Sequence, residues 1–142
     1  VVASAVKAAA GAIYSHLSSN ITSIASGWSA NTNVAWPGVD YDPASEWIRP
    51  TIIWNDGELE TMSSGGTNVI SGILVLSLFD RPGSGYGVLN GYADKARDLF
   101  DRASPGSSVE FLAASGPRQV NQADTRWLQI NISVPFLLEE TS

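Results

Sequence analysis

The clearest structural signal in the chain is the stretch 127–136, which reads Trp127-Leu128-Gln129-Ile130-Asn131-Ile132-Ser133-Val134-Pro135-Phe136. Apolar side chains occupy the even positions, whereas the odd positions begin with a tryptophan and continue with polar residues up to 133. This alternation is typical of a strand that turns one face to a core and the other to solvent. The stretch therefore predicts a half-buried strand of an antiparallel sheet.

Two further strands are predicted upstream. Residues 69–79 carry apolar side chains on both alternating faces, with Ile70, Leu74, Leu76 and Leu78 on one and Ile73, Val75 and Phe79 on the other. A strand of this composition is expected to be covered on both sides. Residues 47–54 are rich in β-branched and aromatic side chains, and Pro50 within them favours a sheet edge or a bulge.

Helical periodicity marks two other segments. Apolar residues at 6, 10, 13, 17, 21 and 24 predict one amphipathic helix over about residues 3–25, ended by Gly27. Apolar residues at 88, 89, 92, 96, 99 and 100 predict a second helix, with Ser84 as N-cap and a stop at residues 104–106. Residues 34–36 indicate a short strand before Pro37, and residues 109–112 and 118–122 indicate a hairpin bent at 115–117.

Strands grouped between helices predict an α+β fold. We expect an antiparallel (mixed) β-sheet flanked by two amphipathic helices, in the order α-β-β-β-α-β-β. The 142 residues are a single-domain length, so residues 1–142 are expected to form one domain.

Composition excludes several classes of function. Eight Lys and Arg stand against fourteen Asp and Glu, so the net charge is −6, and no run of basic residues offers the stripe that grips nucleic acid. The chain has no cysteine, which excludes disulfides, thiolate metal sites and cysteine nucleophiles. No apolar run approaches the ~20 residues of a membrane helix. We therefore expect no specific DNA binding and no membrane.

Three patterns could carry chemistry, and each has a plainer interpretation. The glycine-rich residues 83–87 follow a strand and precede a helix, but they match neither a dinucleotide fingerprint nor a P-loop, so a tight turn is favoured. His16 has no recognisable triad partners. Asp40 and Asp42, and Asp56, Glu58 and Glu60, could hold a hard cation, but they lack a cation-loop spacing and fit solvated loops better. We predict no catalytic residues, no cofactor and no metal, and no enzyme activity.

Five tryptophans are many for this length, and only 15% of the residues are charged. Trp36, Trp47 and Trp54 lie close together in the sequence. They are either core residues or anchors of an interface, in which tryptophan is enriched, and the sequence leaves both interpretations open.

Three segments carry a family resemblance: residues 34–41 (Val-Ala-Trp-Pro-Gly-Val-Asp-Tyr), residues 47–50 (Trp-Ile-Arg-Pro), and residues 71–85, which end in Asp80-Arg81-Pro82-Gly83-Ser84-Gly85. This order of an aromatic-proline turn, an apolar strand, a Pro-Gly-x-Gly loop and a helix ending in Leu99-Phe100 resembles the small tail-terminator-like proteins of long-tailed phages, related to the lambda-type terminator. The resemblance covers residues 34–100.

The resemblance implies a virion protein, assembled in the host cytoplasm, that forms a homohexameric ring. Such a ring would cap the tail tube, end tail polymerisation and join the tail to the head-tail connector or neck protein, with DNA passing through. The alternatives are another neck or head-completion protein, a small ligand-binding module using residues 83–87, or a hydrolase using His16 or the acidic loop.

On this reading, residues that could meet another copy or the tube are Trp36, Trp47, Trp54, Asp80, Arg81, Pro82, Gly83, Gly85, Trp127 and Gln129. Asp56, Glu58 and Glu60 are candidates for a loop that faces the lumen or the tube. Ring closure needs two different surfaces on each copy, and we expect the strands at 69–79 and 127–136 to supply them.

Overall fold

The fold is α+β, as predicted. The computed structural model describes residues 2–30, 32–39, 46–54, 67–80, 86–106, 109–119 and 127–141. The elements in chain order are α1 (Val2–Ser19), α2 (Ile21–Ile24), β1 (Trp47–Trp54), β2 (Thr67–Asp80), α3 (Gly87–Phe100), β3 (Val109–Phe111), β4 (Ser115–Gln119) and β5 (Leu128–Thr141). Compared with the predicted order, the described residues hold one strand fewer before α3 and one more after it.

The sheet is antiparallel and is built around β2 and β5. These two strands pair along their whole length, from Thr67 opposite Thr141 to Asp80 opposite Leu128. β1 pairs with the other side of β2, and both β3 and β4 pair with the other side of β5.

The predicted hairpin of residues 109–122 is wrong, because β3 and β4 both pair with β5. β3 lies opposite residues 136–138 of β5, and β4 lies opposite residues 130–133. β5 is 14 residues long, so its free side has room for two short strands end to end.

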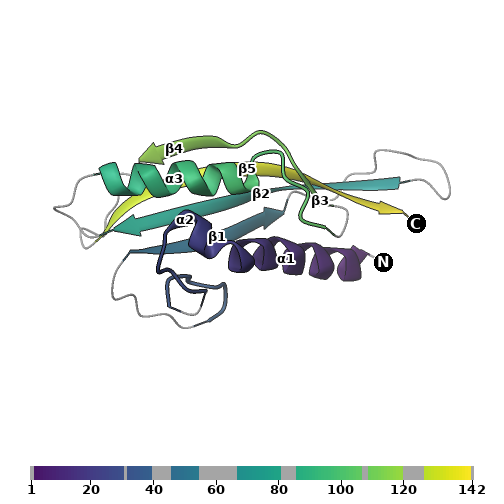
Figure 1. Ribbon diagram of the computed structural model, residues 1–142. Coiled ribbons are helices and arrows are strands. Elements are labelled where there is room, and N and C mark those ends of the chain that lie inside the picture. The colour runs from purple at the N-terminus through teal and green to yellow at the C-terminus, as the bar shows by residue number, and fades with distance from the viewer. Residues whose placement is uncertain are drawn as a thin grey trace.

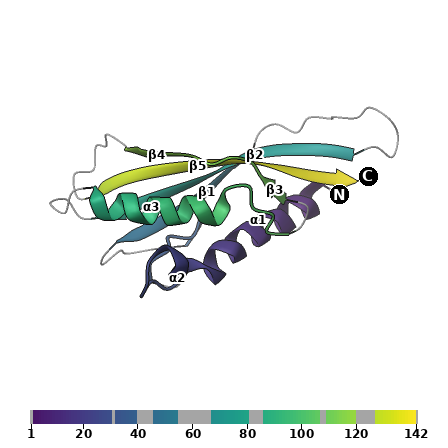
Figure 2. The same cartoon turned by 45° about the horizontal axis from the view of Figure 1, so that its top comes forward.

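The three helices of the described residues lie on one face of the sheet (Figures 1 and 2). The even-numbered residues of β2 and β5 point toward the helices, and Leu74, Leu76 and Leu78 are completely buried. Ile13 and Leu17 of α1 and Phe100 of α3 belong to the same core. Burial of each such side chain contributes about 1.5–3 kcal/mol, and one continuous core fixes the helices against the sheet.

The expected cover on both faces of residues 69–79 is wrong for most of β2. No described helix lies on its second face, where Ile73 and Val75 are only half-buried. Phe79 is buried there, because Trp47 of β1 stacks on it. In β2, apolar residues on both faces therefore do not mean that helices cover both faces.

The predicted first helix is divided at Asn20. α1 ends at Ser19, and the side-chain amide of Asn20 donates to the carbonyl of His16 at 2.9 Å. Ser18, Ser19 and Asn20 compete with the helix for backbone hydrogen bonds, which explains the break. α2 continues the buried stripe with Ile21 and Ile24, and Gly27 then turns the chain with φ +88.

The second helix begins and ends inside its predicted limits. Tyr86, rather than Ser84, occupies the N-cap position, and its side chain makes no capping hydrogen bond. The helix ends at Phe100, because Asp101 is extended and Arg102 has a positive φ of 55. The stop therefore comes before residues 104–106.

β1 has the predicted bounds and lies at an edge of the sheet, as Pro50 indicated. Ile48 exchanges hydrogen bonds with residues 33 and 35 on the side away from β2. Because backbone groups alternate sides along an antiparallel strand, the nitrogen of Pro50 also points away from β2 and no ladder bond is lost. The predicted strand at 34–36 is reduced to a single parallel bridge between Val34 and Ile48.

Candidate functional site

The face of the sheet opposite the helices is the first candidate site, and we call it the outer sheet face. Strand alternation assigns to it the odd-numbered residues of β1, β2 and β5. Those with described side chains are Trp47, Arg49, Thr51, Ile53, Ser71, Ile73, Val75, Ser77, Phe79, Gln129, Asn131, Ser133, Pro135 and Leu137. Arg49 is the one charged residue in this set, and the edge strands add Glu110 of β3, opposite Leu137, and Arg118 of β4, opposite Asn131. The described charges of this face are therefore few and of both signs.

One end of the outer sheet face is aromatic. The rings of Trp47 and Phe79 stack at 3.9 Å with an interplanar angle of 8°. Trp127 meets Trp47 edge-on at 5.9 Å, and the guanidinium carbon of Arg49 lies 5.1 Å from the centre of the Phe79 ring. The predicted interface residues Trp47, Trp127 and Gln129 therefore share this face.

The other end of the outer sheet face is aliphatic and more open. Ile53 lies opposite Ile73 in the β1–β2 register, and Ile73 lies opposite Pro135 of β5. The side chain of Ile53 is 50% exposed, and its neighbours Ile73 and Pro135 are half-buried. An open aliphatic surface of this kind is suited to contact with another protein.

The prediction that residues 69–79 and 127–136 supply two different ring surfaces needs correction. β2 and β5 are hydrogen-bonded neighbours in the middle of the sheet, and their outward residues form one continuous surface. A second surface has to come from another part of the molecule.

The remaining two predicted tryptophans lie away from the outer sheet face. Trp54 points to the helix side, where its ring meets Phe136 edge-on at 5.3 Å. Trp36 lies beside α1, with its ring 5.6 Å from that of Tyr14, and its indole nitrogen donates to the carbonyl of Ala30 at 2.9 Å. The three tryptophans that are close in sequence thus occupy three separate environments.

Asp80 lies on the helix side at the end of β2 and is 4% exposed. Burial, followed by the negative charges of Glu46 and Asp80, raises the pKa of the Tyr92 phenol. The negative charge of Asp80 therefore acts on Tyr92 of α3. The predicted residues Arg81, Pro82, Gly83 and Gly85, and Asp56, Glu58 and Glu60, lie outside the described residues, as do Asp40 and Asp42.

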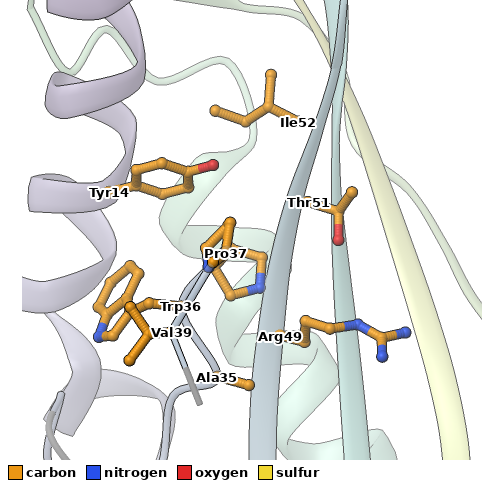
Figure 3. Close-up of a pocket in the computed structure, with 10 residues that line it drawn as sticks. Tyr14, Ala35, Trp36, Pro37, Val39, Arg49, Thr51 and Ile52 are labelled. Carbon is orange, nitrogen blue, oxygen red and sulfur yellow. The ribbon is translucent and has the colours of Figure 1, made fainter. Parts of the chain in front are cut away.

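A pocket of about 320 Å³ opens beside the edge of β1, and we call it the edge pocket. Tyr14, Trp36, Pro37 and Val39 form its apolar wall, and residues 50–52 of β1 form the opposite side. Figure 3 shows Tyr14 reaching from α1 toward the strand, while Arg49 and Thr51 point to the far side of the strand. Burial raises the pKa of the Tyr14 phenol.

A turn at residues 36–39 opens this pocket. The amide of Val39 donates to the carbonyl of Trp36 at 3.2 Å, and Gly38 has φ +76. Proline followed by glycine at positive φ is the sequence of a type II turn. After the Val34 bridge, the structure shows no backbone hydrogen bond between residues 36–39 and β1, although both line the pocket.

Asn33 is a buried structural residue that the sequence patterns did not reveal. Its side-chain oxygen accepts from the amide of Ser29 at 3.0 Å and from the hydroxyl of Thr32 at 2.8 Å. Its amide nitrogen donates to the carbonyl of Glu46 at 3.1 Å. Asn33 thereby joins the loop after α2 to the start of β1 and places the edge pocket; an asparagine in a polar loop gives no signal of this.

The contacts that His16 makes in the structure are with the end of α3. Its Nε2 lies 2.9 Å from the carbonyl oxygen of Leu99, and its ring meets that of Phe100 edge-on at 5.1 Å. These contacts join α1 to the last turn of α3. Within the described ranges, no group of three His, Asp or Glu side chains is placed to hold a metal ion, and no described helix is long and apolar enough to cross a membrane.

The architecture defines an α+β protein whose antiparallel sheet carries helices on one face. No family model matches the chain, and no curated protein matches it. Five chains of solved structures do match. One is a protein known by a sequence identifier alone, which aligns with 93% of this chain and 96% of its own length at a TM-score of 0.65 and 14% identity. This likeness shows the fold.

Proposed function

We propose that this chain is a non-enzymatic structural subunit that assembles with copies of itself, as a tail-terminator-like ring of a long-tailed phage. The observation that carries the proposal is the outer sheet face, which is free of described helices and aliphatic at one end. The phage role rests on the sequence resemblance of residues 34–100. In this role the ring, expected to be a hexamer, contacts the tail tube and the head-tail connector in the virion.

Electrostatics favours the outer sheet face as a contact between copies. Every copy carries a net charge of −6, so contact between copies is favoured where the surfaces that meet carry little negative charge. On the described parts of the sheet, the charged outward side chains are Arg49, Glu110 of β3 and Arg118 of β4, that is, two positive charges and one negative charge. Contact through this surface buries apolar area and brings few like charges together.

Ring closure requires a second, different surface, because a contact between identical patches yields a closed dimer. The side of the molecule that carries the helices can supply one. Val39 is 62% exposed beside α1, and Val88 is 45% exposed on α3. A ring would then form when the outer sheet face of one copy meets the helix side of the next.

The test compares two substitutions that add the same charge. Ile53→Lys places a lysine at the open aliphatic end of the outer sheet face, and Ala113→Lys places one at an exposed position between β3 and β4, at the edge of the sheet. We expect light scattering and negative-stain imaging to show rings of several subunits for the unmodified protein and for Ala113→Lys, but monomers for Ile53→Lys. An unmodified protein that stays monomeric at high concentration and ignores tail tubes would refute the proposal.

A further inference from the structure

We infer that a pocket between β4 and β5 binds a carboxylate, and that in the ring this carboxylate is an acidic side chain of the next copy. The pocket has a volume of about 290 Å³, and we call it the polar pocket. Its lining residues are Ser115, Gly116 and Arg118 of β4 and Asn131 and Ser133 of β5. The carboxylate chemistry follows from these residues, whereas its source in the next copy rests on the proposed function.

The pairing of β4 with β5 is irregular at the polar pocket. Ser115 lies opposite Ser133. Arg118 lies opposite Asn131, so three steps along β4 correspond to two steps along β5. An extra residue of this kind bends an edge strand and redirects its side chains. Glycine is needed at position 116, because its φ is +107 and a Cβ atom there would lie 2.9 Å from the carbonyl oxygen of Asn131.

The polar pocket presents hydrogen-bond donors on the outer sheet face. Arg118 and Asn131 are opposite each other in the register, so their side chains point to the same face. The side-chain oxygen of Asn131 accepts from the amide nitrogen of Gln129 at 3.0 Å, on the side away from Ser133. The oxygen and nitrogen of an amide lie on opposite sides of its carbon. The amide nitrogen of Asn131 is therefore directed toward Ser133 and can donate into the pocket.

Arg118 gives the polar pocket a positive charge. Its side chain is exposed and makes no ion pair with a carboxylate of the described residues. Asp101 approaches β4, but its carboxylate accepts from the amide of Ala114 at 2.7 Å and lies 3.7 Å from the guanidinium of Arg102. Arg97 of α3 donates to the carbonyl of Gly116 at 3.4 Å and adds a second positive charge nearby.

These groups match a carboxylate in shape and in charge. The guanidinium of Arg118 can hold both oxygens of a carboxylate in parallel hydrogen bonds. The amide of Asn131 and the hydroxyl of Ser133 can donate to the remaining lone pairs. The lining carries one positive charge, so a singly charged carboxylate is balanced there. A doubly charged phosphate would bring excess negative charge to a protein of net charge −6.

The position of the polar pocket indicates the source of the carboxylate. Asn131 lies opposite Ser77 of β2, in the middle of the outer sheet face, so the pocket belongs to the surface proposed to meet the next copy. Each copy carries fourteen Asp and Glu. Exposed Asp94 and Asp98 of α3 belong to the helix side, which the proposed ring places against this face. The next copy therefore brings carboxylates to the pocket.

The first test measures carboxylate binding in the Ile53→Lys variant, which is expected to be monomeric and to leave the polar pocket open. The probe is acetyl-Glu-amide, and acetyl-Gln-amide is its uncharged counterpart. In nitrogen–proton NMR spectra, we expect millimolar acetyl-Glu-amide to shift the side-chain signals of Arg118 and Asn131 in a saturable way. Acetyl-Gln-amide should bind at least about tenfold more weakly, because the charge-assisted bonds are lost.

Two substitutions locate the site. In the same background, Arg118→Gln should weaken acetyl-Glu-amide binding at least about tenfold. Lys7→Gln removes an exposed positive charge from α1 and should leave binding unchanged. Equal binding of the two probes, or equal effects of the two substitutions, would overturn the carboxylate site. Binding of inorganic phosphate roughly tenfold more tightly than acetyl-Glu-amide would also overturn it, in favour of a phosphate site.

The second test measures the source of the carboxylate by light scattering, without the Ile53→Lys substitution. We expect Arg118→Gln to assemble only at roughly tenfold higher protein concentration than Lys7→Gln, because an ion pair between copies is lost. If Arg118→Gln weakens binding of the probe but assembles normally, the ligand is a free carboxylic acid and its source in the next copy is wrong. A monomeric unmodified protein refutes the proposed function, whereas the NMR titration still decides whether the pocket binds a carboxylate.

Discussion

Gly72 is the residue at which adding one methyl group should damage the fold most clearly. It lies in β2 between Trp54 of β1 and Phe136 of β5, all on the helix side of the sheet. A Cβ atom at this position would lie 2.6 Å from Cζ of Phe136 and 2.9 Å from the carbonyl oxygen of Ile53. Glycine is needed here because the Phe136 ring lies directly over the backbone.

The Phe136 ring has little freedom to move aside. Trp54 meets it edge-on at 5.3 Å, and Phe111 lies 5.7 Å away on its other side. Overpacking of a tight core costs about 1–3 kcal/mol, and the fixed ring and the backbone contact place Gly72→Ala near the upper end, at about 3 kcal/mol. For a chain of this length, that loss lowers the melting temperature by roughly 10 °C.

Urea unfolding followed by tryptophan fluorescence measures the effect. Gly91→Ala is the matched control, because Gly91 lies at an exposed position of α3 with no atom near its added Cβ. This change should stabilise the protein by about 0.5–1 kcal/mol. In a Phe136→Leu background, Gly72→Ala should cost at least about 1 kcal/mol less. The reasoning is wrong if Gly72→Ala is as stable as the unmodified protein, or if the two substitutions are additive.

Two further predictions concern polar groups. Asp101→Ala should destabilise the protein by about 1–3 kcal/mol in urea unfolding, because the buried amide of Ala114 loses its 2.7 Å bond to the carboxylate, whereas Asp101→Asn should retain most of the stability; equal losses for the two variants would refute this. Burial raises the pKa values of Tyr14 and Tyr92 above 10.0, so the unfolded chain releases these protons first and stability should fall as pH rises above 10. Urea midpoints measured from pH 8 to pH 11 should fall less steeply for Tyr14→Phe/Tyr92→Phe, and identical slopes would contradict this assignment.

Periodicity predicted the elements whose environment is set by neighbours along the chain. The strand at 47–54 has the predicted bounds, and the alternation of residues 128–136 gave the buried face of β5 correctly. The division at Asn20 was missed because apolar spacing continues through it from Leu17 to Ile21. The spacing of apolar residues indicates which side of a segment faces the core. It does not indicate where a helix is interrupted.

The candidate surfaces were predictable only in part. Trp47 and Trp127 were both predicted as interface residues, but the sequence could not show that their rings meet edge-on or that Trp47 also stacks on Phe79. The sequence could not predict that one face of β2 has no helix on it. Ile73 and Val75 are half-buried in the structure, but in the sequence they look like core residues. The edge pocket was not predicted at all, since Tyr14, Trp36 and Ile52 come from three distant segments.

The edges of the sheet explain why open-ended strand addition is disfavoured. β1 is covered by the Val34 bridge and then lacks the N–H of Pro50. At the opposite edge, Ala103 accepts a hydrogen bond from the amide of Phe111 in β3, and β4 pairs with β5 through an irregular register. Bridges, prolines and bulges at edges prevent unspecific pairing between sheets.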